Sequence, residues 1–129
     1  MKTYAWVMGA GALGTAARMG LSNFIADRYG PAFPTGTLVV NVTGCFIIGF
    51  FYAMTGPNSS FIAPPLVRQT VMIGFLGGYT TFSSFSLQTL NLLNDGEWLY
   101  GGLNVLLSVA GCLVAAWAGL ALGGQLGNR

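Results

Sequence analysis

Long apolar segments with almost no charge are the feature that most constrains this chain. Of its 129 residues, 53% are hydrophobic and 6% are charged, whereas an ordinary soluble domain has roughly 25% charged residues. A helix that crosses a bilayer needs about 20 mostly apolar residues, and the chain is long enough for four, with little left over. The sequence therefore predicts one all-α membrane domain, residues 1–129, with transmembrane helices at about 4–25, 36–54, 65–94 and 98–126.

The first apolar segment runs on to Ile25, beyond the length of a signal-peptide core, so we expect it to remain as a helix. Its small residues Ala10, Gly14 and Ala17 share one face, as is typical where membrane helices touch. Arg18 lies on the same side. It either extends to the headgroups from the last turns of the helix or attracts anions to a water-filled entry.

Asn41 is the polar exception in the second helix, on the face that it shares with Thr37 and Cys45. A side-chain amide is costly in hydrocarbon unless it is paired. It either bonds another helix, which the residues alone favour, or faces a water or ion path. Cys45 and Cys112 lie in apolar segments, where a reduced, buried thiol is expected, with no disulfide and no metal.

The third apolar segment contains the run GFLGGYTTFSSFS, residues 74–86, which mixes a glycine pair with hydroxyls and two phenylalanines. Gly77 and Gly78 predict a break, which is either a simple kink or a pair of helix ends that bind ions. Carbonyls at such an end suit a cation, and free amides suit an anion. Phe82 and Phe85, one turn apart, either pack together or offer positive ring edges to an anion.

Uncharged polar groups recur elsewhere in the apolar segments. Asn104, Ser108 and Cys112 follow at four-residue intervals on the fourth helix and predict a packed or a wet groove.

The ionisable residues exclude most enzymes. There is no histidine, and the carboxylates Asp27, Asp95 and Glu97 fall in or beside turns. Nucleophilic catalysis therefore has no support, and a proton-coupled exporter would lack its carboxylate in mid-membrane. Passive permeation fits better than a dual-topology small-molecule exporter. A purely structural membrane subunit, in which Gly77 and Thr80 form only a kink, is the other alternative.

The basic residues set the orientation only weakly. One side of the membrane would hold Lys2, Arg68 and Arg129, and the other Arg28, joined by Arg18 if it extends to the headgroups. A chain that inserts both ways can form a dimer of opposite orientations.

The run GFLGGYTTFSSFS, the upstream run GTLVVNVTG and the stripe of Asn104, Ser108 and Cys112 closely resemble the bacterial fluoride channels called Fluc or CrcB. The resemblance covers nearly the whole chain. It implies an antiparallel, dual-topology homodimer in the bacterial inner membrane, with two fluoride pores at the subunit interface and no nucleic-acid partner. It also implies a structural sodium ion that is required but not transported.

The same resemblance implies roles for individual residues. Backbone carbonyls of Gly77 and Thr80 would bind sodium, and Phe82 and Phe85 would contact fluoride by their ring edges. The remaining expected pore and vestibule residues are Asn41, Thr37, Ser83, Ser84, Asn104, Ser108 and Arg18. Asn104 and Cys112 depart from the family pattern, which often has tyrosine at the first position and serine or threonine at the second.

Overall fold

The computed structural model describes residues 1–127, so Arg129 of the orientation argument lies outside the described residues. The described chain is helical, without strands. The helix α1 covers Lys2–Tyr29, α2 covers Thr35–Met54 and α6 covers Trp98–Gly127. Between α2 and α6 in the sequence, four segments form a third rod: α3 (Pro65–Gln69), a π-helical segment η1 (Thr70–Leu76), α4 (Gly77–Tyr79) and α5 (Phe82–Asn94).

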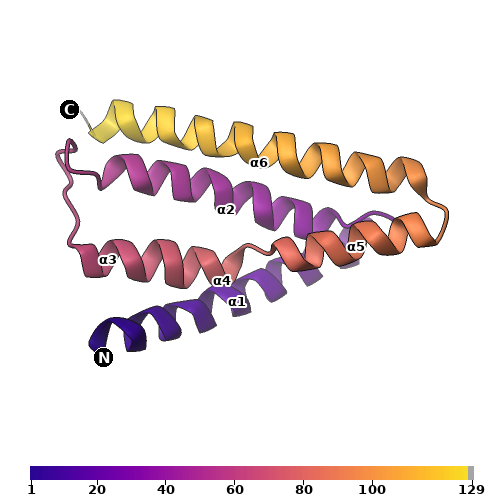
Figure 1. Ribbon diagram of the computed structural model, residues 1–129, viewed down its shortest axis with the longest axis horizontal. Helices are drawn as coiled ribbons and strands as arrows, with labels where there is room; N and C mark the ends of the chain where they lie inside the picture. Colours follow the sequence, from indigo (N-terminus) through magenta and orange to yellow (C-terminus); the bar gives the residue numbers. More distant parts are fainter. Residues whose placement is uncertain (128–129) are drawn as a thin grey trace.

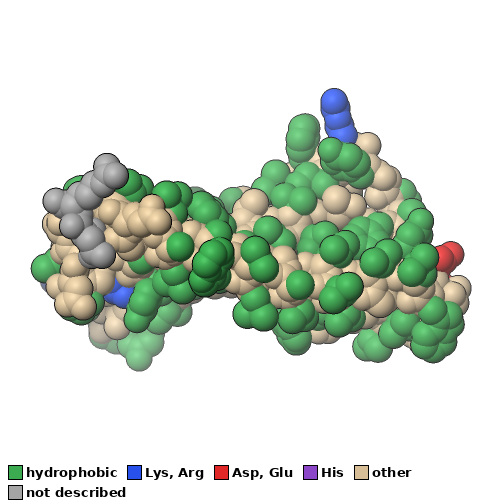
Figure 2. Space-filling model, turned by 90° about the horizontal axis from the view of Figure 1, so that it is seen from above, with side chains coloured by type: hydrophobic (Ala, Val, Ile, Leu, Met, Phe, Trp, Pro, Cys, Tyr) green, Lys and Arg blue, Asp and Glu red, His purple; other side chains and the backbone are tan. Residues whose placement is uncertain are grey.

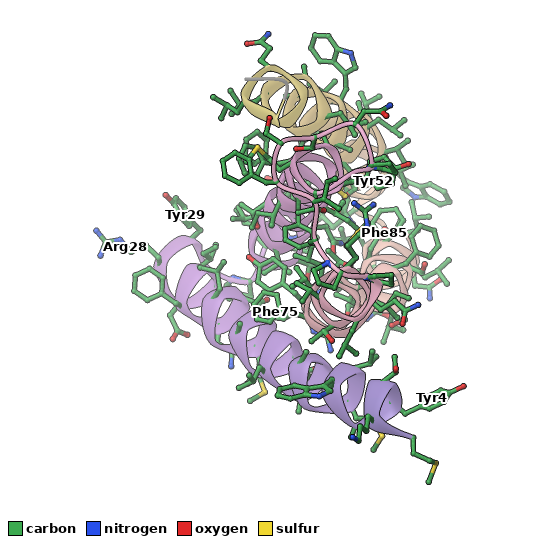
Figure 3. The ribbon with its side chains drawn as sticks, turned by 90° about the vertical axis from the view of Figure 1, so that its left-hand side faces the viewer. Tyr4, Arg28, Tyr29, Tyr52, Phe75 and Phe85 are labelled. Atoms are coloured by element: carbon green, nitrogen blue, oxygen red, sulfur yellow. The ribbon has the colours of Figure 1, made fainter. Side chains whose placement is uncertain are left out.

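The helices form a bundle in which direction alternates along the chain. Figure 1 shows the amino terminus, the end of α6 and the α2–α3 connection at one end of the bundle. Because consecutive long segments run in opposite directions, α2 and α6 run parallel to each other, and they pack along their length. The helix α1 contacts η1 and α4, and Figure 3 shows it crossing the bundle obliquely.

Glycines allow the helix backbones to approach closely. A Cβ on Gly14 of α1 would overlap the carbonyl oxygen of Phe75, and one on Gly78 would overlap the carbonyl oxygen of Gly11. On the small-residue face predicted for α1, Ala10 and Gly14 do pack against the third rod, whereas Ala17 is exposed. Small residues are thus what joins α1 to the rest of the bundle.

The outer surface of the bundle is largely apolar. Figure 2 shows hydrophobic side chains over most of the visible face, with few charged ones. Large side chains such as Trp6, Leu13 and Trp117 are each more than half exposed. By length and composition, α2 and α6 are apolar enough to cross a membrane. The 28 residues of α1 extend about 42 Å at the usual helical rise.

Two expectations from the sequence are wrong in position. The first helix ends at Tyr29 rather than near Ile25, so Arg18 lies about three turns before its end and not in its last turns. The third rod does break, but Gly77 and Gly78 are helical and the break lies at Thr80 and Thr81. The local sequence predicts a break at the glycine pair because it does not show that Gly78 packs against the α1 backbone at Gly11.

Candidate ion site at the helix break

Two extended residues interrupt the third rod. Thr80 has ψ 158° and Thr81 has φ −151° and ψ 112°, whereas Gly77 has helical values of −65° and −33°. Thr81 is the N-cap of α5, since its Oγ1 accepts a hydrogen bond from the amide of Ser84 at 3.2 Å. The amino-terminal end of α5, with its positive dipole, therefore begins inside the bundle.

Asn41 of α2 holds the break by both ends of its side-chain amide. Its Nδ2 donates to the carbonyl oxygen of Thr81 at 3.0 Å, and its Oδ1 accepts from the amide of Thr81 at 2.7 Å. Both residues are buried. Asn41 thus connects two helices, which is the pairing role favoured by the residues alone.

At the break, the backbone carbonyls of Gly77 and Thr80 lose the amide donors that they would have in a continuous helix. In an uninterrupted helix the amide of Thr81 would donate to the carbonyl of Gly77, but here it donates to Asn41. The amide of Ser84, which would reach the carbonyl of Thr80, donates to the Oγ1 of Thr81 instead. Gly77 is exposed and Thr80 is half-buried in the single chain. Released carbonyl oxygens of this kind fit a hard cation such as sodium.

A groove of about 330 Å³ lies on one side of the break, and we call it the aromatic groove. The rings of Phe82 and Phe85 lie 5.2 Å apart between centroids and are tilted by 48°. Phe85 is 8% exposed, whereas Phe82 is 77% exposed, so Phe82 faces away from its own chain. The lining residues are Asn41, Cys45, Thr80, Thr81, Phe82, Phe85, Ser108, Val109, Cys112 and Leu113.

A second cavity of about 270 Å³ is also lined by Thr81, and we call it the arginine cavity. Arg18 and the hydroxyl-bearing residues Thr37 and Ser84 line it, so a guanidinium and several donors face the same space. The lining residues are Thr15, Arg18, Met19, Ser22, Asn23, Thr37, Thr81, Ser84 and Gln88. Thr81 is the residue that lines both the aromatic groove and the arginine cavity.

Asn104 connects α6 to α5 rather than lining either space. Its Nδ2 donates to the Oγ1 of Thr89 at 2.9 Å, and the hydroxyl of Thr89 donates to the carbonyl of Phe85 at 2.8 Å. The hydroxyl of Ser108 donates to the Oδ1 of Asn104 at 3.4 Å. Asn104 is 2% exposed. This chain of hydrogen bonds fixes the turn of α5 that carries Phe85.

The structure brings most of the predicted site residues around the break. Asn104 is an exception, because it is buried between helices. Ser83 is exposed beside Thr81, and the two hydroxyl oxygens are 3.3 Å apart. The lining residues of the arginine cavity that are absent from the predicted site are Thr15, Met19, Ser22, Asn23, Thr81 and Gln88. Thr81 had a usable signal, because a threonine three residues before Ser84 in a helical pattern favours an N-cap.

Comparison with known proteins identifies the family. The family model described as "CrcB-like protein, Camphor Resistance (CrcB)" matches residues 5–120. The chain belongs to the CrcB family. A CrcB relative from Opitutus terrae is 54% identical over 119 residues, covering 92% of this chain and 90% of that protein. Relatives from Methylocella silvestris and Rhodospirillum rubrum are 51% and 50% identical, covering 90% and 91% of this chain and 88% and 91% of theirs. All three are named fluoride-specific ion channel FluC.

The part of the chain that matches the CrcB model includes every residue of the aromatic groove and the arginine cavity. It also includes the whole third rod with its break. The match to the family model therefore includes the candidate site as well as the apolar helices around it.

Proposed function

We propose that this protein is a fluoride channel that lets the anion leave the bacterial cytoplasm across the inner membrane. The observation that carries this proposal is the break at Thr80 and Thr81. It places a helix amino terminus, uncharged hydroxyls and an aromatic pair beside one groove. Relatives about half identical to this chain carry the name of a fluoride-specific channel.

Fluoride must lose water to enter such a groove, at a cost that only dense, fixed donors offset. Ser108 and the two threonines of the break supply hydroxyls along the aromatic groove. The edges of Phe82 and Phe85 supply weakly positive ring hydrogens. Arg18 supplies positive potential in the arginine cavity, where Thr37 and Ser84 continue the donors toward the break.

The path is passive in this proposal. The three carboxylates lie at one end of the bundle: Asp27 in the last turn of α1, and Asp95 and Glu97 in the α5–α6 connection. None is in position to carry a proton across, which disfavours the alternative of a dual-topology small-molecule exporter. An inside-negative potential favours anion exit by about 2.3 kcal/mol per charge for each 100 mV.

A second copy of the chain completes the proposed channel. Phe82 and Gly77 are exposed in the single chain although they lie at the break, in mid-bundle. A partner of opposite orientation would cover them and form two pores at the interface. Its symmetry axis would bring the carbonyls of Gly77 and Thr80 from both copies around one structural sodium ion, which stays in place while fluoride moves.

Fluoride efflux from proteoliposomes, followed with a fluoride electrode, tests this function. We expect rapid efflux after a potassium ionophore balances the charge, and no comparable efflux of chloride. Efflux that requires a pH gradient would favour the exporter instead, and the absence of any fluoride efflux from well-folded protein would refute the channel.

A further inference from the structure

Two cysteines from different helices line the wall of the aromatic groove. They are Cys45 of α2 and Cys112 of α6. Both side chains are half-buried and both cysteines are free. The pair therefore lies beside Phe85, on the surface of a space large enough for ions and water.

The packing of α2 against α6 fixes this pair. Because the two helices run parallel, residues four positions further along each helix form the next layer of contact. In that layer a Cβ on Gly49 would overlap the carbonyl oxygen of Ala116. On the other side, a Cβ on Gly111 would lie 3.3 Å from the side chain of Val42. Close approach of α2 and α6 on both sides therefore places Cys45 and Cys112 in one layer of the contact between the two helices.

Thiolate sulfur prefers soft metal cations. A pair of thiols without further carboxylate or imidazole ligands suits a d10 cation that accepts two ligands in a line, such as Cu⁺, Ag⁺ or Hg²⁺. Within residues 1–127, no group of three or more histidine, cysteine or carboxylate side chains is positioned to hold a metal. Cations that need four ligands, such as zinc in its structural sites, are therefore disfavoured here.

We propose that Cys45 and Cys112 form a two-coordinate site for a soft metal cation, and that its occupation obstructs the aromatic groove. With Hg²⁺ the two S–H bonds break, two S–Hg bonds form and two protons leave, without any change of oxidation state. The obstruction, but not the binding, rests on the proposed channel function. The sequence alone predicts reduced, buried thiols without a metal, because it does not place the two helices side by side.

Metal binding is tested by intact-mass spectrometry of the purified full chain after treatment with mercuric chloride and then with an excess of a monothiol. We expect the unaltered protein to retain one mercury per chain, with the loss of two protons. Cys45→Ala and Cys112→Ala should each lose the mercury in the monothiol, because a single sulfur cannot chelate. Cys112→Ser offers the same test with a side chain closer in size.

Several results would overturn the site. Retention of mercury by both single variants, uptake of two mercury ions per unaltered chain, or no uptake at all would each do so. Loss of two protons without mercury would show a disulfide in place of a metal site and would also overturn it.

Fluoride efflux measured with and without mercuric chloride, in both cases after treatment with an excess of the same monothiol, tests the obstruction. We expect loss of efflux for the unaltered chain, while each single variant keeps its own untreated rate. Chelation with unchanged efflux would overturn the obstruction and leave the site standing. If untreated, folded protein shows no efflux, the channel proposal fails, and the mass measurement still decides the site.

Discussion

The side-chain amide of Asn41 forms two hydrogen bonds with the backbone of Thr81, 40 positions further along the chain. This contact provides the amide and carbonyl of Thr81 with partners in place of the helical ladder. Thr81 lines both the aromatic groove and the arginine cavity, so the shape of both spaces depends on this contact.

Replacing Asn41 with leucine should therefore open the break. The variant leaves the buried amide and carbonyl of Thr81 without partners, each at a cost of about 1–3 kcal/mol. We expect a lower midpoint of thermal unfolding in detergent and loss of fluoride efflux. Asn58→Leu, in the exposed α2–α3 connection, is the matched control. Wild-type stability of the Asn41 variant would show that other contacts hold the break.

The two phenylalanines should differ in their effect on stability but not in their effect on flux. Phe82→Ile should leave unfolding of the single chain nearly unchanged because Phe82 is 77% exposed, whereas Phe85→Ile removes a buried ring. We expect both to lower fluoride efflux sharply. Phe24→Ile, on the exposed side of α1, is the control. Normal efflux through both variants would remove the aromatic pair from the pore.

Arg18 should raise the rate at which fluoride enters. Arg18→Gln removes the guanidinium from the arginine cavity and should lower flux roughly tenfold at low ionic strength, with a smaller effect at high salt. Arg28→Gln changes an exposed arginine in the last turn of α1 and serves as the control. An equal effect at all salt concentrations would indicate a structural role for Arg18.

Sodium should be needed for an active channel if the carbonyls of Gly77 and Thr80 bind it. Protein purified and reconstituted in N-methylglucamine salts is expected to give no efflux and a lower unfolding midpoint. Adding sodium before reconstitution should restore both. Fluoride movement should carry no sodium, which isotope flux can check. Full activity without sodium would mean that these carbonyls have another partner, such as water.

The contact of α1 with the third rod should tolerate no added side-chain atom at Gly14. A Cβ there would overlap the carbonyl oxygen of Phe75, so Gly14→Ala should destabilise the fold by about 1–3 kcal/mol. Gly20 lies in the same helix with nothing within 4 Å of an added Cβ. Gly20→Ala should therefore be neutral or stabilising by up to about 1 kcal/mol. Equal unfolding midpoints for the two variants would contradict this packing.

The sequence allowed the helices to be predicted better than the site. The length of the apolar segments and the proline and glycine residues beside them predict the ends of Thr35–Met54 and Trp98–Gly127 to within one residue, because hydropathy is a local property. The position of the break is not local. Thr81 lies outside the helix because its amide donates to Asn41 and not to a helical carbonyl. Gly78 stays helical because it packs against α1. The role of Asn104 likewise depends on Thr89, a residue of another helix.

The π-helical segment Thr70–Leu76 has a consequence for how this fold tolerates changes in length. A π-turn holds one residue more than an α-turn, so it rotates everything after it by about 100° around the helix axis. Both the approach of Gly78 to α1 and the direction of Thr81 toward Asn41 depend on that rotation. Deleting one residue from the segment would leave a regular α-helix whose break points away from α2. The direction in which the break faces is therefore fixed by the π-helical segment that precedes it.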